Sequence, residues 1–191
     1  MGSSTESGSA ARILDITESL VQQRGFNAVS YRDIAAELHV TTPAVHYHYR
    51  SKSDLGAALV ERYRVRFGQA LDQLESDSPR QALIGYVGLF DSVLVRDRMC
   101  LCGMLAAEYS TLPEAMQRSV LGFFADSEAW LARQLERGQR DGSLTLTASP
   151  QQHAQVLLSA LEGAMLVARA HNDPHRLRTV ADPLLATLSQ G

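Results

Sequence analysis

The sequence predicts an all-α protein, because apolar residues recur at helical spacing along nearly the whole chain of 191 residues. Only residues 143–147 alternate as a strand would, and that segment is too short and too isolated to form a sheet. Glycines, prolines and N-terminal capping residues divide the helical stretches into about nine helices, and no internal repeat is visible.

Composition fits one generous domain, or two small ones that share a core. Hydrophobic residues make up 45% and charged residues 20%, as in ordinary soluble proteins. Two cysteines cannot form a disulfide framework, which indicates a reducing, cytoplasmic compartment. No apolar run approaches the ~20 residues that span a bilayer, so we expect no membrane segment. Residues 1–10 lack the features of a signal peptide and are expected to form a disordered tail.

Charge is distributed unevenly, although the whole chain carries only −3. Residues 11–67 have a balance of +2, whereas residues 68–191 have a balance of −4. The N-terminal third therefore has the sign that suits a polyanion, and it contains Lys52, the only lysine of the chain. Statistical scatter alone would also give an imbalance of this size.

The first four helices are expected over residues 11–24, 31–38, 42–49 and 52–75. Gly25 is a natural stop for the first of them. The second and the fourth begin with a capping box, formed by Ser30 with Asp33 and by Ser51 with Asp54.

The remaining helices are expected over residues 80–95, 100–110, 113–137, 150–170 and 175–188. Most of them begin after a proline or a short polar break, and the long helix over residues 113–137 ends at glycine-containing turns.

Two short helices joined by a tight turn and preceded by a supporting helix form a helix-turn-helix pattern. Pro43 suits the first turn of the second short helix, where its missing N–H costs nothing. The apolar seam between the helices is expected to consist of Ile34, Ala35, Leu38, Val40 and Val45. The exposed positions, which can donate hydrogen bonds or touch a thymine methyl group, are Thr42, Pro43, Ala44, His46, Tyr47 and His48.

Residues 12–58 resemble the DNA-binding domain of TetR-family transcriptional repressors. The segments that carry the match are Gly25-Phe26, Ser30–Ala35, Val40-Thr41, Ala44–Tyr49 and Lys52. The resemblance implies an all-α homodimer of nine helices, with a helix-turn-helix domain over 11–55 and a larger ligand-binding and dimerisation domain over 56–191.

The resemblance also implies roles for single residues. Arg32 stands where the family contacts the major groove or the backbone, and Tyr31 and Tyr47 stand where it contacts phosphates. Lys52 occupies the phosphate-clamping position at the start of the fourth helix. A glycine is common where His39 stands. The positions that read bases are Thr42, Pro43, Ala44, His46 and His48, and a tyrosine is frequent where His46 stands.

In this architecture the fourth to eighth helices bracket a cavity for a small-molecule inducer. The candidate lining residues are Tyr86, Phe90, Cys102, Leu105, Tyr109, Phe123, Phe124, Trp130 and Met165. Such residues at helical spacing also occur as plain core. Glu108 either orients a ligand in this cavity or is a solvated surface residue.

The last two helices offer apolar faces that would close a four-helix bundle across a two-fold axis, and thus form a homodimer. Gly163 with Ala164 would allow close approach. The faces consist of Val156, Leu157, Ala160, Leu161 and Ala164 in one helix and Val180, Leu184 and Leu188 in the other. The alternative is that they only cover their own core.

These features predict a ligand-responsive repressor that binds a palindromic double-stranded DNA operator as a homodimer and is released by a small molecule. One alternative is a repressor that senses oxidants or electrophiles through Cys100 or Cys102. Another is a small helical enzyme or binding protein without DNA function, although no nucleophile–base spacing or phosphate-binding loop is present. His46 and His48 point to different helix sides, so we expect no metal and no cofactor.

Overall fold

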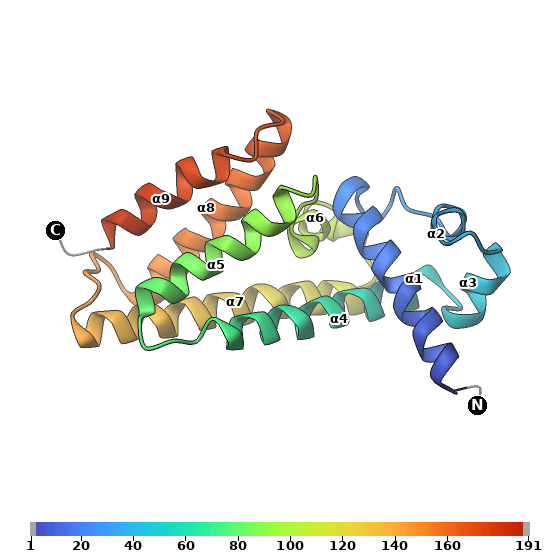
Figure 1. Ribbon diagram of the computed structural model, residues 1–191, viewed down its shortest axis with the longest axis horizontal. Helices are drawn as coiled ribbons and strands as arrows, with labels where there is room; N and C mark the ends of the chain where they lie inside the picture. The colour runs from blue at the N-terminus through green and yellow to red at the C-terminus, as the bar shows by residue number, and fades with distance from the viewer. Residues whose placement is uncertain (1–2, 189–191) are drawn as a thin grey trace. The chain divides into compact units, whose positions relative to one another are not determined.

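The computed structural model describes the backbone of residues 3–188 and the side chains of residues 8–188. Within this range the chain is all-α, as predicted, and no strand is formed (Figure 1). Its elements are α1 (Ser3–Arg24), α2 (Tyr31–Leu38), α3 (Thr42–His48), α4 (Lys52–Gln73), α5 (Pro79–Leu94), α6 (Leu101–Ala107), the 3-10 helix η1 (Tyr109–Thr111), α7 (Glu114–Asp141), α8 (Pro150–Ala170) and α9 (Arg176–Thr187).

Two boundaries correct the sequence-based expectations. Helix α1 begins at Ser3, so a disordered tail over residues 1–10 is wrong from Ser3 on; residues 1–2 lie outside the described range. Once a helix is nucleated, each added residue costs little even in a serine-rich stretch. Helix α7 continues through Gly138 to Asp141, and Leu144 packs against the space that a Cβ at Gly138 would fill.

Contacts between residues divide the chain into two compact units. Unit 1 comprises the residues up to Val65 together with Leu101–Leu121, and unit 2 comprises Arg66–Cys100 and the residues from Gly122 on. The expected division at residue 55 assumed contiguous domains. Instead α6, expected in the ligand-binding domain, packs on α1 within unit 1.

Unit 1 is built around helices α1, α2 and α3, which pack on one another and follow the expected helix-turn-helix order (Figure 1). Its core consists of side chains from all three helices and from the start of α4. Among the buried residues are Ile13, Leu20, Val21, Phe26, Ile34, Val45, Leu55 and Leu59.

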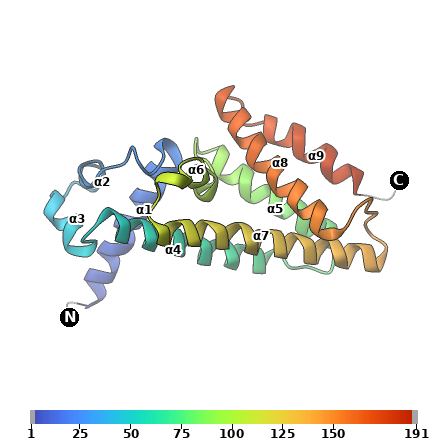
Figure 2. The ribbon, with the colours of Figure 1, turned by 180° about the vertical axis from the view of Figure 1, so that it is seen from behind.

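Unit 2 contains α5, α8 and α9, of which α8 and α9 form an antiparallel pair that packs along its length (Figure 2). Helix α5 contacts both members of this pair. The core is rich in large side chains, among them Leu83, Tyr86, Phe90, Phe123, Trp130, Leu161 and Met165. None of the described helices combines the length and apolar character that a membrane span requires.

Candidate DNA-binding surface and ligand-binding core

Helix α2 begins with the predicted capping box. The Ser30 hydroxyl accepts a hydrogen bond from the Asp33 N–H at 3.3 Å, and the Asp33 carboxylate accepts one from the Ser30 N–H at 2.8 Å. The Ser30 hydroxyl also donates to the Asp33 carboxylate, and this bond, followed by the one from the Ser30 N–H, holds the pKa of Asp33 below its usual range. The second predicted box is also present, because Ser51 and Asp54 make the same reciprocal pair at the start of α4. Helices α2 and α4 therefore both start where the sequence predicts.

The turn between α2 and α3 is closed by His39, which adopts the left-handed conformation with φ 54° and ψ 42°. The His39 N–H donates to the Ala36 carbonyl, and the Val40 N–H donates to the Ala35 carbonyl at 3.0 Å. This is the geometry that favours glycine, which explains why a histidine here stands out. Pro43 then lies in the first turn of α3, as expected.

Tyr31 has a different role from the one predicted. Its side chain is buried, and its hydroxyl donates to the carbonyl of Tyr49 at 2.9 Å. Burial, followed by the nearby Asp54 carboxylate, raises the pKa of Tyr31 to about 12. Its ring also meets the His46 ring edge-on, with centroids 4.3 Å apart. Tyr31 therefore anchors the end of α3 to α2, and the expectation that it reaches out to a phosphate is wrong for this conformation.

Helix α3 buries one side chain, Val45, and presents the rest of its surface outward. Tyr47 is 71% exposed. Of the other predicted reading positions, Pro43, Ala44 and His46 are exposed, and Thr42 and His48 are half-buried. A short helix with this much free surface has the form needed to enter a major groove.

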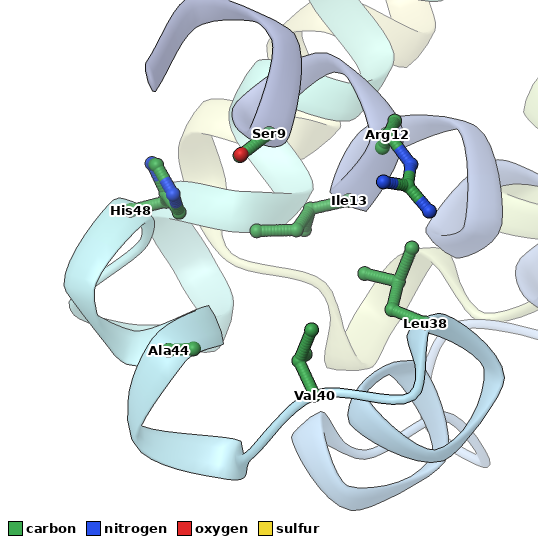
Figure 3. A pocket seen from close by; sticks show the side chains of 7 residues that line it. All are labelled: Ser9, Arg12, Ile13, Leu38, Val40, Ala44 and His48. Carbon is green, nitrogen blue, oxygen red and sulfur yellow. The ribbon is translucent and has the colours of Figure 1, made fainter. Parts of the chain in front are cut away.

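The predicted apolar seam is only partly closed. Ile34, Ala35 and Val45 are buried, but Leu38 is half-buried and Val40 is 46% exposed. The expectation fails at Val40 because α1 and α3 leave an open hollow of about 420 Å³ there (Figure 3). Its lining residues are Ser9, Arg12, Ile13, Leu38, Val40, Ala44 and His48.

The hollow adds two polar residues of α1 that the sequence analysis missed. Figure 3 shows both residues on the α1 side of the hollow, with the Ser9 hydroxyl towards His48 and the Arg12 guanidinium on the side of Leu38. A cation and a hydroxyl beside the reading positions are the groups that contact phosphate oxygens. The sequence offered no signal for them beyond their position next to Ile13 on the first helix.

The Lys52 side chain makes contacts within the protein, and its role as a phosphate clamp stays a prediction. Its ammonium group donates to the Asn27 carbonyl at 3.3 Å and lies 4.6 Å from the centroid of the Phe26 ring. Burial lowers the pKa of Lys52, while the Glu108 and Asp33 carboxylates act in the opposite direction. Exposed cations of the helix-turn-helix region include Arg12, Arg24, Arg32 and Arg50.

Glu108 is neither of the two things expected of it. Its carboxylate accepts hydrogen bonds from the N–H of Phe26 at 2.7 Å and from the N–H of Asn27 at 3.2 Å. Gly25, with φ 85°, allows the Glu108 carboxylate to approach this closely, because a Cβ at position 25 would lie only 2.8 Å from Glu108 Oε1. The Asn27 amide also donates to the Thr111 hydroxyl at 2.7 Å. The end of α6 is thus bound to the loop between α1 and α2.

The predicted ligand-lining residues divide between the two units. Cys102 and Leu105 are fully buried in unit 1, which also contains Glu108 and the half-buried Tyr109. Unit 2 holds the other six, of which Tyr86, Phe90, Phe123, Trp130 and Met165 are buried and Phe124 is half-buried.

The aromatic members within unit 2 contact one another. Tyr86 stacks on Trp130 with ring centroids 5.6 Å apart, and it lies 5.4 Å from Phe90. Phe67, which the sequence analysis did not single out, meets Tyr86 at 6.0 Å and Phe123 at 4.8 Å. Phe67 therefore belongs to the same aromatic cluster as the predicted ligand-lining residues of unit 2.

Both cysteines are buried and free of disulfide bonds, Cys100 in unit 2 and Cys102 in unit 1. A thiol sensor needs an accessible thiolate, and neither side chain is accessible in this conformation. Among the described residues, no group of three or more histidine, cysteine or acidic side chains is arranged to hold a metal ion.

About half of the residues on the predicted dimerisation faces are already buried within unit 2. Leu157, Leu161, Ala164 and Leu188 are buried, Ala160 and Leu184 are half-buried, and Val156 and Val180 are exposed. Between α8 and α9 an apolar groove of about 590 Å³ remains open, with Gly163 in its floor. Its lining residues are Ala160, Gly163, Ala164, Val167, Arg176, Thr179 and Val180.

Comparison with known proteins agrees with this geometry. Residues 13–59 match the family model of the bacterial regulatory proteins of the tetR family, and residues 93–184 match that of the tetracyclin repressor-like C-terminal domain. A TetR-family transcriptional regulator from Agrobacterium tumefaciens is 31% identical over 97% of this chain and 100% of that one, with a TM-score of 0.93.

Two further proteins are similar over most of their length. A TetR transcriptional regulator from Legionella pneumophila is 30% identical over 93% of this chain and 96% of its own, with a TM-score of 0.82. The repressor NemR of Escherichia coli is 28% identical over 88% of both chains. The crystal structure of its reduced form gives a TM-score of 0.81 over 95% of this chain and 97% of that one.

Proposed function

Because the chain belongs to the TetR family of bacterial transcriptional regulators, we propose that it represses transcription by binding a palindromic operator as a homodimer, and that a small-molecule inducer releases it. DNA recognition belongs to unit 1, and inducer binding and dimerisation belong to unit 2. A repressor acts where its operator lies, so the proposal places the chain in the cytoplasm.

The outward surface of α3 is the observation that carries the DNA-binding proposal. Its exposed positions are held in place from behind by the capping box of α2 and by the hydrogen bond from Tyr31 to Tyr49. In this proposal His46 and Tyr47 meet base edges or phosphates, together with the half-buried His48. Arg12, Arg32 and Ser9 contact the DNA backbone. Lys52 contacts a phosphate only after its hydrogen bond to the Asn27 carbonyl is broken.

The proposed dimer uses α8 and α9. The groove between them is apolar and is lined by the exposed Val167 and Val180, and α8 also exposes Val156 and Leu166. Large aliphatic side chains that a monomer exposes on one helix pair are typical of an interface between subunits. A second copy that brings the same two helices would close a four-helix bundle, and the dimer would supply one α3 helix for each half of a palindrome.

Selection of DNA sites from a random duplex pool tests the DNA-binding proposal. The purified protein, refolded without ligand, should enrich a palindrome whose affinity falls steeply with salt. His46→Ala should weaken the enriched site more than a scrambled duplex, because base contacts carry the specificity. His175→Ala removes an exposed histidine from unit 2 and should change neither affinity. Failure of the refolded protein to enrich any sequence would contradict the proposal.

Sedimentation of a groove variant tests the proposed dimer. Val167→Glu places a charge in the groove and should convert a dimer into a monomer, because burying an unpaired carboxylate is unfavourable. Val95→Glu is the matched control, since Val95 is also exposed in unit 2 but lies at the end of α5. Equal sedimentation of both variants and the unmodified chain would show that the interface lies elsewhere.

A further inference from the structure

Apart from Arg98 Nε, the core of unit 2 encloses four buried polar atoms that have no hydrogen-bond partner among the described residues. They are Tyr86 Oη, Ser127 Oγ, Trp130 Nε1 and Glu162 Oε1. The side chains of Tyr86, Ser127 and Trp130 are at most 2% exposed. Native proteins satisfy nearly all buried polar groups, so a cluster of unsatisfied ones marks a place where another molecule completes the hydrogen bonds.

These groups face one another across three helices. The Tyr86 ring of α5 stacks on the Trp130 ring of α7 with an interplanar angle of 19°. Ser127 is close enough to the Tyr86 hydroxyl to oppose the rise that burial causes in its pKa, and Glu162 of α8 adds to that rise. The cluster therefore combines hydroxyl and indole donors with a carboxyl group.

Glu162 is the unusual member, because nothing cationic acts on it. Burial raises its pKa to about 7, and the one group that opposes this is the Cys100 thiol, which hydrogen-bonds to it. The ionisable groups that act on the neighbouring Tyr86 are Cys100, Glu128 and Glu162 itself, none of which carries a positive charge. The residue Glu162 as a whole is half-buried, but its Oε1 is fully buried. A buried carboxylate oxygen without a counter-ion favours a ligand that brings one.

The walls of the cluster also suit a cation. Phe67 lies beside Tyr86 and Phe90, at 6.0 and 6.4 Å between ring centroids. The faces of aromatic rings attract positive charge, and tryptophan does so most strongly. An anion would be repelled by Glu162, and a neutral molecule would leave the carboxylate uncompensated.

We propose that the inducer is an organic cation, an amine or quaternary ammonium ion with an apolar body, which binds Glu162 between the faces of Tyr86 and Trp130. This assignment rests on the proposed function as a ligand-responsive repressor. Because the two rings stack on each other here, the ligand enters only when they separate. Its affinity thus differs between two conformations of unit 2, as induction requires.

Intrinsic fluorescence tests the proposal directly, because Trp130 is the only tryptophan of the chain. The full-length protein is titrated with benzyltrimethylammonium, benzyl alcohol and benzoate, which share a ring but differ in charge. The cation should bind at least about tenfold more tightly than the other two at about pH 8. Its affinity should fall towards pH 6, as the carboxyl group takes up a proton.

Glu162→Gln should weaken cation binding at least about tenfold and abolish its pH dependence, while benzyl alcohol binding stays unchanged. Glu136→Gln removes the same charge from an exposed site on α7 and should change nothing. Equal binding of all three probes, no effect of Glu162→Gln, or no binding at about 10 mM of the cation would overturn the proposal.

Binding of the selected operator by the same preparations separates this proposal from the previous one. A protein that binds its operator but not the cation is a regulator with a different class of ligand. A protein that binds no specific DNA contradicts the proposed function itself, whatever the cation does.

Discussion

Two glutamates, one in each unit, differ in how the charge of their carboxylates is compensated. The Glu108 carboxylate of unit 1 accepts hydrogen bonds from two backbone N–H groups, and the Lys52 ammonium lies close enough to feel its charge. The Glu162 carboxyl of unit 2 has an oxygen without any partner and no cation that acts on it. Both residues interrupt otherwise apolar stretches, so the sequence alone gives no reason to treat them differently.

The difference separates a structural acid from one that is available to a ligand. Backbone N–H groups compensate the charge of Glu108 permanently, so it stabilises the loop between α1 and α2. Glu162 is costly to ionise until something else supplies the compensation. Variants of the two residues should therefore respond to pH and to DNA in opposite ways.

The largest expected effect concerns Glu162 and pH. Because folding raises the pKa of this carboxyl from 4.5 to about 7, its contribution to stability is fully present below about pH 4.5. It is lost as the pH rises through 7, which amounts to about 3 kcal/mol by pH 8. Glu162→Gln should remove this decline. The free energy of unfolding, measured by urea titration with Trp130 fluorescence at several pH values, checks it.

The matched control for this prediction is Glu136→Gln on the exposed side of α7. It should keep the decline between pH 4.5 and pH 8 that the unmodified chain shows. A decline that survives in Glu162→Gln would mean that another group titrates, and the contrast between the two glutamates would lose its basis.

The second effect concerns Glu108. Glu108→Ala leaves the N–H groups of Phe26 and Asn27 without their acceptor, which should cost about 2 kcal/mol. The loop before α2 should then move, so affinity for the selected operator should fall more than affinity for scrambled DNA. Anisotropy titrations with both duplexes measure this ratio. Glu114→Ala, which breaks only an exposed pair with Arg118, should leave the ratio unchanged.

The helix-turn-helix could be predicted from the sequence because its signals are local. The capping boxes at Ser30 and Ser51 and the proline at position 43 each act within one helical turn. Periodicity likewise located most helices to within a few residues. Helix α1 is the main exception, because propagation from an existing helix leaves no mark in the sequence.

The site chemistry was harder to predict because it depends on distant partners. Glu108 lies 82 positions from Phe26, and no local pattern links them. Tyr31 fits a phosphate-binding motif, yet its hydroxyl is used by a carbonyl 18 residues away. No local pattern singles out Glu162 either, since burial of its oxygen depends on the packing of α5, α7 and α8.

A third, smaller effect concerns the hydrogen bond that the Tyr31 hydroxyl makes within unit 1. Tyr31→Phe keeps the buried ring but removes the hydrogen bond to the Tyr49 carbonyl, which should cost about 1 kcal/mol. Thermal unfolding of the variant checks this. Tyr47→Phe is the control, because its side chain is 71% exposed and its hydroxyl should matter for DNA rather than for stability. Equal stability of the two variants would show that the Tyr31 hydrogen bond is not important.

The smallest effect distinguishes the two cysteines. The Cys100 thiol lowers the pKa of Glu162 through a hydrogen bond, so Cys100→Ala should move the pH-dependent loss of stability to higher pH. Cys102 belongs to unit 1, and Cys102→Ala should leave that pH profile in place. Urea titrations across the pH range measure the shift. Because both thiols are buried, both variants should still be released from the operator by a cationic inducer. Loss of release in Cys102→Ala alone would instead favour a repressor that senses oxidants or electrophiles through this thiol.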